Sequence, residues 1–346
     1  MKPHVLVARM DSLGDVLVCG PAIRAVAHGA RLVSVLAGPL GAPAARLLPG
    51  VDDVISWPCP WIAADPPAVE PREINQLVNR LAAARVDEAI ILTSFHQSAL
   101  PTALLLRMAG VDRITAISED YPGSLLDVRV QPPGDAPEPE RMLAVARAAG
   151  YELPPGDDGL LALTEHLPPP AGLPHSPYVV VHPGAAAPAR TYPEARWCEL
   201  VALLTGQGRH VLITGSHGEA PLTARVAGAA VPPGHARDCG GLFDVPALAA
   251  ALRGASVVVA GNTGPAHLAA AVGTPVVSLF APVVPAARWA PYGVAVALLG
   301  DQLADCRDSR ARECPVAGHP CLSSVSPAAV AAAIDEVGAE CEAVPA

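Results

Sequence analysis

The stretch VARMDSLGDVLVCGPAIRAV, residues 7–26, decides how this chain begins to fold. An apolar run, HVLVA (4–8), stops at a polar turn, and a helical pattern follows at once. A strand that leads through a short turn into a helix is the opening of a β-α unit. Asp15 lies where the turn meets the helix. Burying a carboxylate there costs free energy unless the site uses it, so Asp15 is the first candidate functional residue.

The alternation of strand and helix continues along the chain. Continuous runs of Val, Ile and Leu, as expected for parallel strands covered on both faces, predict strands at 4–8, 31–37, 88–93, 114–118, 178–182, 210–215, 256–261 and 275–280. Helical patterns lie between them, including 21–29, 74–84, 194–208 and 246–254. This repetition predicts an α/β fold with open, doubly wound sheets.

One interruption divides the chain. The segments 131–139 and 167–177 are rich in proline, which excludes a packed interior strand, and the β-α pattern starts afresh after them. Two Rossmann-like domains of this kind would face a central cleft and bind ligands outside the carboxyl ends of their strands. We therefore expect a first domain over 1–165, a Pro-rich linker over 166–177, a second domain over 178–325 and a C-terminal helix within 326–346.

Composition narrows the possible partners. The chain has 346 residues, of which 51% are hydrophobic, so it can bury a core. Its formal net charge of −10 argues against a nucleic-acid partner, which needs clustered Lys and Arg. No segment has the pattern of a signal peptide or a transmembrane span. We therefore expect a soluble, cytoplasmic protein whose eight cysteines are mostly reduced.

The polar turn GNTG (261–264) is the second candidate site feature. It follows a predicted strand, and Pro265 suits the first turn of a helix. Backbone N–H groups at a helix N-terminus attract phosphate, and glycine lets the anion approach. An ordinary Asn or Thr helix cap explains the same turn. His267, one turn further on, faces either a ligand or the core.

Four motifs in order together resemble glycosyltransferase family 9. They are LGD after the first strand, HPG followed by a basic residue and Tyr-Pro, TGS-x-x-E, and TGPAHLAAAVGTPVVSLFAP. The resemblance covers nearly the whole chain, and the family contains the ADP-heptose:lipopolysaccharide heptosyltransferases. It implies a GT-B fold of two Rossmann-like domains, with acceptor mostly on the first and nucleotide-sugar mostly on the second. It also implies inversion at the anomeric carbon and no required metal.

The resemblance assigns roles to residues that match its motifs. Asp15 matches the residue implied to be the general base. Arg190 lies where the family usually has a phosphate-binding Lys, and an arginine keeps that charge. Glu219 matches an acidic residue implied to contact the ribose. Thr263 and Gly264 match the turn that holds the phosphates.

Other matches are less regular. Asn262 falls where heptosyltransferases commonly carry an Asp that touches the donor sugar, which leaves the donor sugar open. His267 matches the family's His on the following helix. Gly14 is expected to let the backbone turn sharply beside the ligand. His96 follows the third predicted strand and either binds acceptor or is an ordinary polar loop residue.

The predicted chemistry is transfer of a sugar, first of all heptose from ADP-heptose, to an acceptor hydroxyl. Asp15 would be kept ionised by the start of a helix and would take the hydroxyl proton, while Asp11 and Ser12 serve as caps. Arg190 and the N–H groups near Thr263 would stabilise the departing diphosphate in place of a metal. The nucleotide-sugar is a substrate, so no cofactor is expected.

Several alternatives stay open. The acceptor could be lipopolysaccharide core, another saccharide or a small soluble metabolite, and the donor could be another nucleotide-sugar. A GT-B nucleotide-sugar epimerase or a non-catalytic binder of such sugars would share the architecture. A nicotinamide-dependent oxidoreductase would need G-x-G-x-x-G after a strand, which the stretch MDSLGDVLVCG (10–20) lacks.

The cysteines near the C-terminus form the last candidate. Cys306, Cys314 and Cys321, with His319 among them, could form a zinc site, but their spacing lacks C-x-x-C. Reduced thiols or one labile disulfide are the other interpretations, and we expect no metal.

Overall fold

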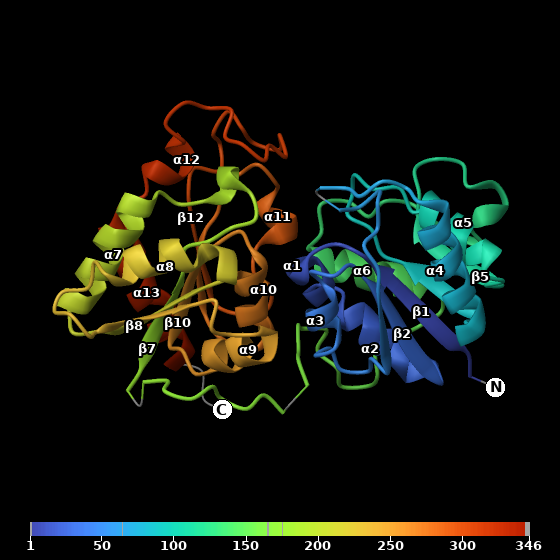
Figure 1. The fold of residues 1–346 in the computed structure, drawn as a ribbon, viewed down its shortest axis with the longest axis horizontal. Coiled ribbons are helices and arrows are strands. Elements are labelled where there is room, and N and C mark those ends of the chain that lie inside the picture. The colour runs from blue at the N-terminus through green and yellow to red at the C-terminus, as the bar shows by residue number, and fades with distance from the viewer. Residues whose placement is uncertain (1, 64, 165, 175, 343–346) are drawn as a thin grey trace. The chain divides into compact units, whose positions relative to one another are not determined.

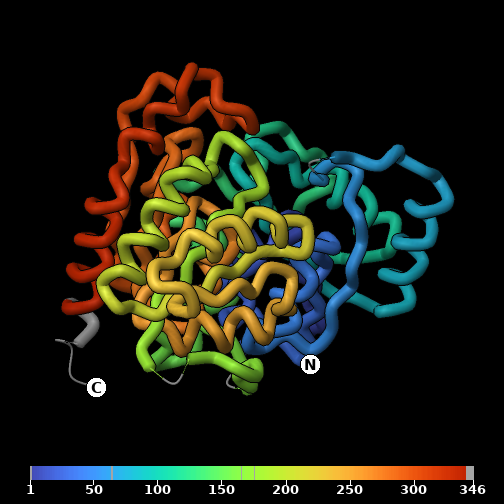
Figure 2. The backbone as a smooth tube through the Cα atoms, turned by 60° about the vertical axis from the view of Figure 1, so that its left-hand side comes forward, coloured from blue at the N-terminus to red at the C-terminus, as the bar shows by residue number. Residues whose placement is uncertain are grey.

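Two compact units make up the chain, Met1–Thr164 and Glu165–Ala346. The computed structural model describes residues 2–63, 65–164, 166–174 and 176–342. Each unit contains one six-stranded sheet in which every pairing is parallel, with helices covering both of its faces (Figures 1 and 2). The two sheets confirm the predicted fold class, a pair of Rossmann-like domains of the GT-B kind.

The first unit has the strand order β3-β2-β1-β4-β5-β6. Its strands are β1 (His4–Arg9), β2 (Leu32–Ala37), β3 (Asp53–Ser56), β4 (Glu88–Ile91), β5 (Arg113–Ile117) and β6 (Val128–Val130). Its helices are α1 (Leu13–Leu17), α2 (Gly20–Gly29), α3 (Ala42–Ala45), α4 (Pro71–Ala84), α5 (Leu100–Met108), α6 (Glu138–Ala148) and the 3-10 turn η1 (Gly123–Leu125).

The second unit repeats the arrangement with the order β12-β11-β10-β7-β8-β9. Its strands are β7 (Tyr178–His182), β8 (His210–Gly215), β9 (Ala236–Gly240), β10 (Val257–Gly261), β11 (Val276–Leu279) and β12 (Val296–Leu299). Its helices are α7 (Glu194–Gly206), α8 (Ala220–Ala227), α9 (Val245–Arg253), α10 (Gly264–Ala271), α11 (Ala286–Trp289), α12 (Pro320–Ser323), α13 (Pro327–Glu342) and the 3-10 turns η2 (Pro188–Arg190) and η3 (His217–Glu219).

The eight strands predicted from apolar runs are the four interior strands of each sheet. Interior strands are buried on both faces, so their sequences are continuously apolar, as in β1 and β7. The structure adds β3, β6, β9 and β12, which the sequence analysis missed. All four lie at a sheet edge and are partly exposed. Polar residues interrupt the apolar pattern of β3, β6 and β9, whereas β12 was missed although all four of its residues are apolar.

The strand orders create one switch point in each sheet. From β1 the chain proceeds outward to β2 and β3, and then returns to β4 on the other side of β1. In the second unit the same reversal places β10 beside β7. Loops that leave the carboxyl ends of two such strands diverge, and the space between them is the usual ligand site of an open α/β sheet. A ligand site is therefore expected at the segments that follow β1 and β4 in the first unit and β7 and β10 in the second.

The chain's last helix belongs to the second unit. Helix α13 packs against α7 and against strands β10 to β12, and its Val330, Ile334 and Val337 are buried in that core. Residues 343–346 of the predicted C-terminal segment lie outside the described residues. No helix in the described part of the chain combines the length and the apolar character needed to cross a membrane.

A largely buried ion pair ties the end of the first unit to helix α2. Arg24 donates from Nε and Nη2 to the two carboxylate oxygens of Asp157, at 2.7 Å each. These hydrogen bonds hold the pKa of Asp157 below its usual value. Because the folded-state pKa is lowered, the pair stabilises the fold fully above about pH 4, and this contribution is lost as the pH falls below that value.

We therefore expect Arg24→Met to lower the free energy of unfolding at pH 7 by about 3 kcal/mol, since it leaves a buried carboxylate unpaired. At pH 3 the loss should be smaller, because Asp157 without its arginine partner, in the variant and in the unfolded chain, is then largely protonated and no unpaired charge is buried. Urea unfolding at both pH values measures the difference. Arg147→Met is the control, because the Arg147–Glu152 pair is exposed and is worth at most about 1 kcal/mol. An equal loss for Arg24→Met at pH 3 and pH 7 would contradict the assignment.

Candidate functional site

Asp15 lies at the switch point of the first sheet, just beyond the carboxyl end of β1. Its carboxylate is held on both oxygens. Oδ1 accepts a hydrogen bond from Arg9 Nη2 at 2.9 Å, and Oδ2 accepts bonds from Ser12 N at 3.3 Å and Ser12 Oγ at 2.5 Å. The side chain is 19% exposed, so it is anchored and still reachable from solvent.

Arg9 is the centre of this cluster, and its side chain is fully buried at the end of β1. Its Nε forms an ion pair with Asp11 Oδ2 at 2.8 Å, and Nη2 donates a hydrogen bond to Ser94 Oγ at 2.8 Å. Burial alone disfavours the charged form of Arg9, but the surrounding carboxylates, Asp11 foremost, more than offset it and raise its pKa. The guanidinium is therefore a permanent cation inside the site.

Asp11 and the loop after β4 provide further polar contacts around Arg9. Gln97 donates from its amide to Asp11 Oδ1 and accepts from Ser94 N at 3.0 Å. Burial raises the pKa of Asp11, while Arg9 and Gln97 act in the opposite direction. Ser94 and Gln97 thus connect the carboxyl ends of β1 and β4, which are the two strands of the switch point.

A second buried ion pair lies behind the cluster on α6. Arg141 Nε is 3.0 Å from Glu138 Oε1, and both side chains are almost completely buried. Arg9 Nη1 points to the sulfur of Met142 at 3.6 Å, and the charge of Glu138 contributes to the raised pKa of Arg9. Helix α6 therefore supplies the wall against which the Arg9 guanidinium packs.

The short helix α1 changes two expectations about this segment. The helical pattern after the first strand forms two helices: α1 ends at Leu17, and α2, which contains the helix predicted at 21–29, starts at Gly20. A helix of five residues has little dipole, so the cation of Arg9, rather than a helix N-terminus, is the main favourable charge near Asp15. Asp15 also shares the capping role that was expected of Asp11 and Ser12, through a capping box with Ser12. Gly14 is a buried helical residue and not the sharp turn that the sequence suggested.

His96 lies in the loop that follows β4, on the other side of the switch point. Its side chain is exposed and its ring contacts Phe95, with ring centroids 6.3 Å apart. The neighbouring Ser94 and Gln97 carry the contacts to the Asp15 cluster. The structure therefore places His96 near the predicted site but gives the connecting role to its neighbours.

In the second unit, Glu219 lies just beyond β8 and repeats the geometry of Asp15. Its Oε2 accepts hydrogen bonds from Ser216 N and Ser216 Oγ, both at 2.7 Å. The other face of the carboxylate lies against Gly184, in the loop after β7. A Cβ atom at Gly184 would come within 1.8 Å of Glu219 Oε1, so only glycine allows this approach. The loops after β7 and β8 are thus joined at Glu219.

Arg190 and the GNTG turn are brought together by the pairing of β7 with β10. Arg190 is in the 3-10 turn η2 after β7, and a Cβ atom at Gly261 would lie 2.8 Å from the Arg190 carbonyl oxygen. Gly261 is the last residue of β10, directly before Asn262 and Thr263. The close backbone approach sets the predicted phosphate-binding arginine beside the predicted phosphate-binding turn.

The GNTG turn leads into α10 as the sequence indicates. Thr263 is the N-cap residue with an extended backbone, and α10 begins at Gly264. Asn262 is buried, and its Nδ2 has no hydrogen-bond partner among the residues described. An unsatisfied buried amide donor is costly unless a ligand or water meets it. His267 is 4% exposed, and its ring packs edge-on to Trp289, so it lies in the core below the turn.

The cysteine segment shows no metal cage. Cys306 and Cys321 are buried side by side, and burial together with Cys306 raises the pKa of Cys321 to about 12. Both are free thiols, as is Cys314, whose Sγ lies 3.3 Å from the Val316 carbonyl oxygen. Within the described ranges, no group of three or more His, Cys, Asp or Glu side chains is placed to hold a metal ion.

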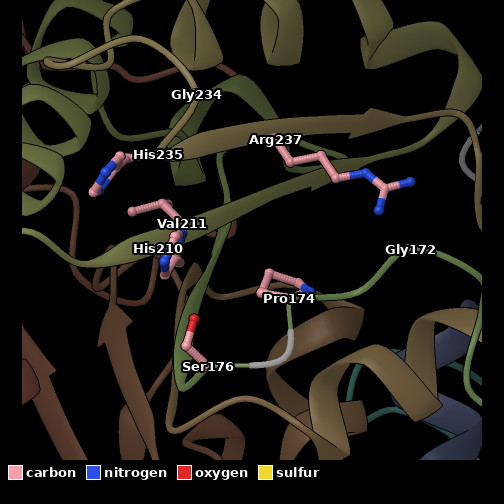
Figure 3. A pocket seen from close by; sticks show the side chains of 8 residues that line it. All are labelled: Gly172, Pro174, Ser176, His210, Val211, Gly234, His235 and Arg237. Carbon is pink, nitrogen blue, oxygen red and sulfur yellow. The ribbon is translucent and has the colours of Figure 1, made fainter.

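A cavity of about 550 Å³ lies at the opposite end of the second sheet (Figure 3). His210, the first residue of β8, stacks on His235, with ring centroids 5.0 Å apart. Arg237 extends away from these rings toward Gly172. Because this cavity is at the amino-terminal ends of the strands, it is separate from the residues that follow β7, β8 and β10.

Sequence reasoning missed the partners rather than the central residues. Arg9 is a charged residue at the end of an otherwise apolar strand, and that position is the signal that could have identified it. Ser94 and Gln97 carry no comparable signal, because each is of a residue type common in loops, and Gly184 was noted only as part of the HPG motif, without a role. Their roles arise from strand order, which places the loops after β1 and β4, and after β7 and β8, next to each other.

Comparison with known proteins agrees with this architecture. Residues 74–318 match the model of glycosyltransferase family 9 (heptosyltransferase). No curated protein matches the chain.

Solved structures with the same fold include three relatives at low sequence identity. The ADP-heptose lps heptosyltransferase II of E. coli is 21% identical, with 99% of this chain and 100% of that chain covered and a TM-score of 0.76. A family 9 glycosyl transferase of Veillonella parvula is 16% identical over 98% of both chains, with a TM-score of 0.78. E. coli heptosyltransferase WaaC, solved with ADP-2-deoxy-2-fluoro heptose, is 20% identical over 96% of this chain and 99% of that one, with a TM-score of 0.71.

The family match spans more than half of the chain, and the fold agrees along nearly its full length. The protein is a glycosyltransferase that belongs to glycosyltransferase family 9.

Proposed function

We propose that this protein is an inverting transferase that moves a sugar, first of all heptose from ADP-heptose, to an acceptor hydroxyl. The observation that carries the proposal is the Asp15 carboxylate, which is reachable from solvent yet fixed on both oxygens at the first switch point. A fixed, ionised carboxylate is what a general base for a hydroxyl proton requires. The ADP-heptose analogue bound by the related WaaC makes that donor the first candidate.

The bond changes follow from this assignment. The acceptor oxygen attacks the anomeric carbon from the face opposite the diphosphate, and Asp15 takes its proton. The bond from the anomeric carbon to the diphosphate oxygen breaks, and the nucleoside diphosphate leaves with that electron pair. Arg190 and the N–H groups at the start of α10 stabilise the negative charge that develops on the leaving group. Glu219 accepts hydrogen bonds from the ribose hydroxyls.

Asn262 supports a second candidate within the same class. It stands where heptosyltransferases commonly carry an aspartate that touches the donor sugar, and its Nδ2 is a buried donor with no partner among the described residues. An amide in that place donates a hydrogen bond that a carboxylate cannot donate. A different nucleotide-sugar, transferred to a saccharide or to a small soluble metabolite, is therefore the alternative.

Thermal unfolding with ADP, GDP, UDP and dTDP, and then with their sugar conjugates, identifies the donor. Ligand at 100 times its dissociation constant should stabilise the fold by about 2.7 kcal/mol. Under the leading proposal, ADP and ADP-heptose raise the unfolding temperature and the other nucleotides do not. A shift with a different nucleotide would select the second candidate. No shift with any of them would overturn both.

Asp15→Asn tests the general base. The amide keeps the shape of the side chain but cannot take the proton, so kcat should fall by about 100-fold or more while donor affinity stays unchanged. Transfer to a panel of sugar and metabolite acceptors, followed by mass spectrometry, gives the rate. Ser98→Ala, in the exposed part of the loop after β4, is the control and should transfer at the wild-type rate. Wild-type transfer by Asp15→Asn would remove the proposed role.

Gly184→Ala tests the placement of Glu219. The new methyl group would displace the carboxylate, so nucleotide affinity should fall by roughly tenfold or more, as for the loss of a hydrogen bond to a charged group. Calorimetric titration with the nucleotide identified above measures this. Gly218→Ala is the matched control, because a Cβ atom there meets nothing within 4 Å. Equal affinities for the two variants would contradict the assignment.

A further inference from the structure

Arg9 is more deeply buried and has more partners than an ordinary surface ion pair requires. A single exposed salt bridge would contribute at most about 1 kcal/mol, whereas burying a guanidinium costs several unless every partner is well placed. Arg9 is fully buried, and its donors reach Asp11, Asp15 and Ser94 with distances of 2.8 to 2.9 Å. The fold therefore supplies an environment built for this one side chain.

The contacts of Arg9 form two groups: one group holds its own guanidinium in place, and the other fixes Asp15. Asp11, Ser94 and Met142 hold the guanidinium from the turn after β1, from the loop after β4 and from α6. Nη2, which also donates to Ser94, is the donor that reaches Oδ1 of the more exposed carboxylate, Asp15. Arginine can serve both groups at once because its N–H donors are fixed in a planar fork, which a lysine ammonium lacks.

We infer that Arg9 is a positioning residue for the proposed transfer: it fixes Asp15 Oδ1 at the switch point and keeps that carboxylate ionised, while Asp11 and Ser94 hold the guanidinium in place. This inference rests on the proposed function for its catalytic consequence. Its physical content, that Arg9 governs the charge state and the orientation of Asp15, stands independently of any activity.

The variants must separate positioning from stability. Arg9→Lys keeps the positive charge but loses the fork. The double variant Arg9→Gln with Asp11→Asn removes one cation and one carboxylate together, so the buried cluster keeps its net charge and the fold is preserved even where Arg9→Gln alone would unfold. Arg24→Met is the matched control, since it breaks a comparably buried Arg–Asp pair of the same unit away from Asp15.

The first measurement is the titration of Asp15, followed by NMR of 13C-labelled aspartate carboxyl groups in the full chain, with the signal assigned through Asp15→Asn. Loss of a contacting cation alone raises the titration midpoint of a carboxylate by about one to three pH units. The Asp15 midpoint should rise by less than this in the double variant, because Asp11→Asn also removes a like charge that interacts with Asp15. Arg9→Lys should give a smaller shift. Arg24→Met should leave the Asp15 midpoint where it is in the wild type.

The second measurement is kinetic. The acidic limb of the pH profile of kcat/KM should move to higher pH in the double variant, in parallel with the NMR midpoint. At its optimum pH, kcat should still be lower by about 10- to 100-fold because the base is no longer aligned, and the affinity for the nucleotide should not change. Arg9→Lys should recover part of this loss, which a purely structural role would not predict.

The outcomes distinguish this inference from the proposed function. If the Asp15 titration midpoint and the pH profile of kcat/KM in both Arg9 variants equal those of Arg24→Met, Arg9 is only part of a structural ion pair and the inference is overturned. If the wild-type chain transfers no sugar, the proposed function fails, whereas the NMR midpoint still decides whether Arg9 governs Asp15. If Asp15→Asn is fully active while the midpoint shifts, Arg9 controls a carboxylate that is not the base, and its positioning role in transfer is refuted.

Discussion

A guanidinium buried at the end of a central strand must be fully paired, and much of the first unit is arranged around this requirement. Arg9 takes its partners from the turn after β1, from α1, from the loop after β4 and from α6. The last two segments are distant from Arg9 in sequence, and the loop after β4 reaches it because β1 and β4 are neighbours in the sheet. Leaving any one of the buried donors unmet would cost about 1 to 3 kcal/mol. Because Arg9 must be paired, the folding of the first unit and the geometry at its switch point depend on each other.

The second unit repeats part of this geometry at Glu219, where a glycine lies against the carboxylate in the place that Arg9 takes beside Asp15. Ser12-Leu13-Gly14-Asp15 and Ser216-His217-Gly218-Glu219 share one pattern, in which a serine after a strand holds the acidic side chain three residues later. The difference lies on the other face of each carboxylate. Asp15 meets a guanidinium, which favours its ionised form, and Glu219 meets the glycine backbone at Gly184. The same serine-to-carboxylate pattern thus holds both residues for which we propose a role, Asp15 as the base and Glu219 as the ribose ligand.

How much the sequence predicts depends on burial. The eight interior strands are visible because burial on both faces demands continuous apolar residues. The edge strand β3 shows why most edge strands are not: Asp53 and Ser56, two of its four residues, are polar and exposed, so its composition does not distinguish it from a loop. Strand β12 is an exception, because its four residues are all apolar and it was still missed. Asp15 and the GNTG turn were found because local motifs mark them. Ser94, Gln97 and Gly184 act through neighbours from other strands, and such contacts depend on a strand order that no local pattern encodes.

The net charge of the buried cluster around Arg9 in the first unit favours the proposed role of Asp15 as a base over a role as an acid. With every group ionised, Arg9 and Arg141 supply two positive charges, and Asp11, Asp15 and Glu138 supply three negative ones. The surplus of one negative charge is held in place by pairing and by hydrogen bonds from Ser12 and Gln97. If Asp15 is the proposed base, the proton of an acceptor hydroxyl would bring the cluster to neutrality, and neutrality is favoured where water is scarce. Asp15 is the most exposed of the three carboxylates, so it is the one that an acceptor would reach first. Burying the Arg9 guanidinium costs free energy, and the same burial favours the uptake of one proton by the negatively charged cluster.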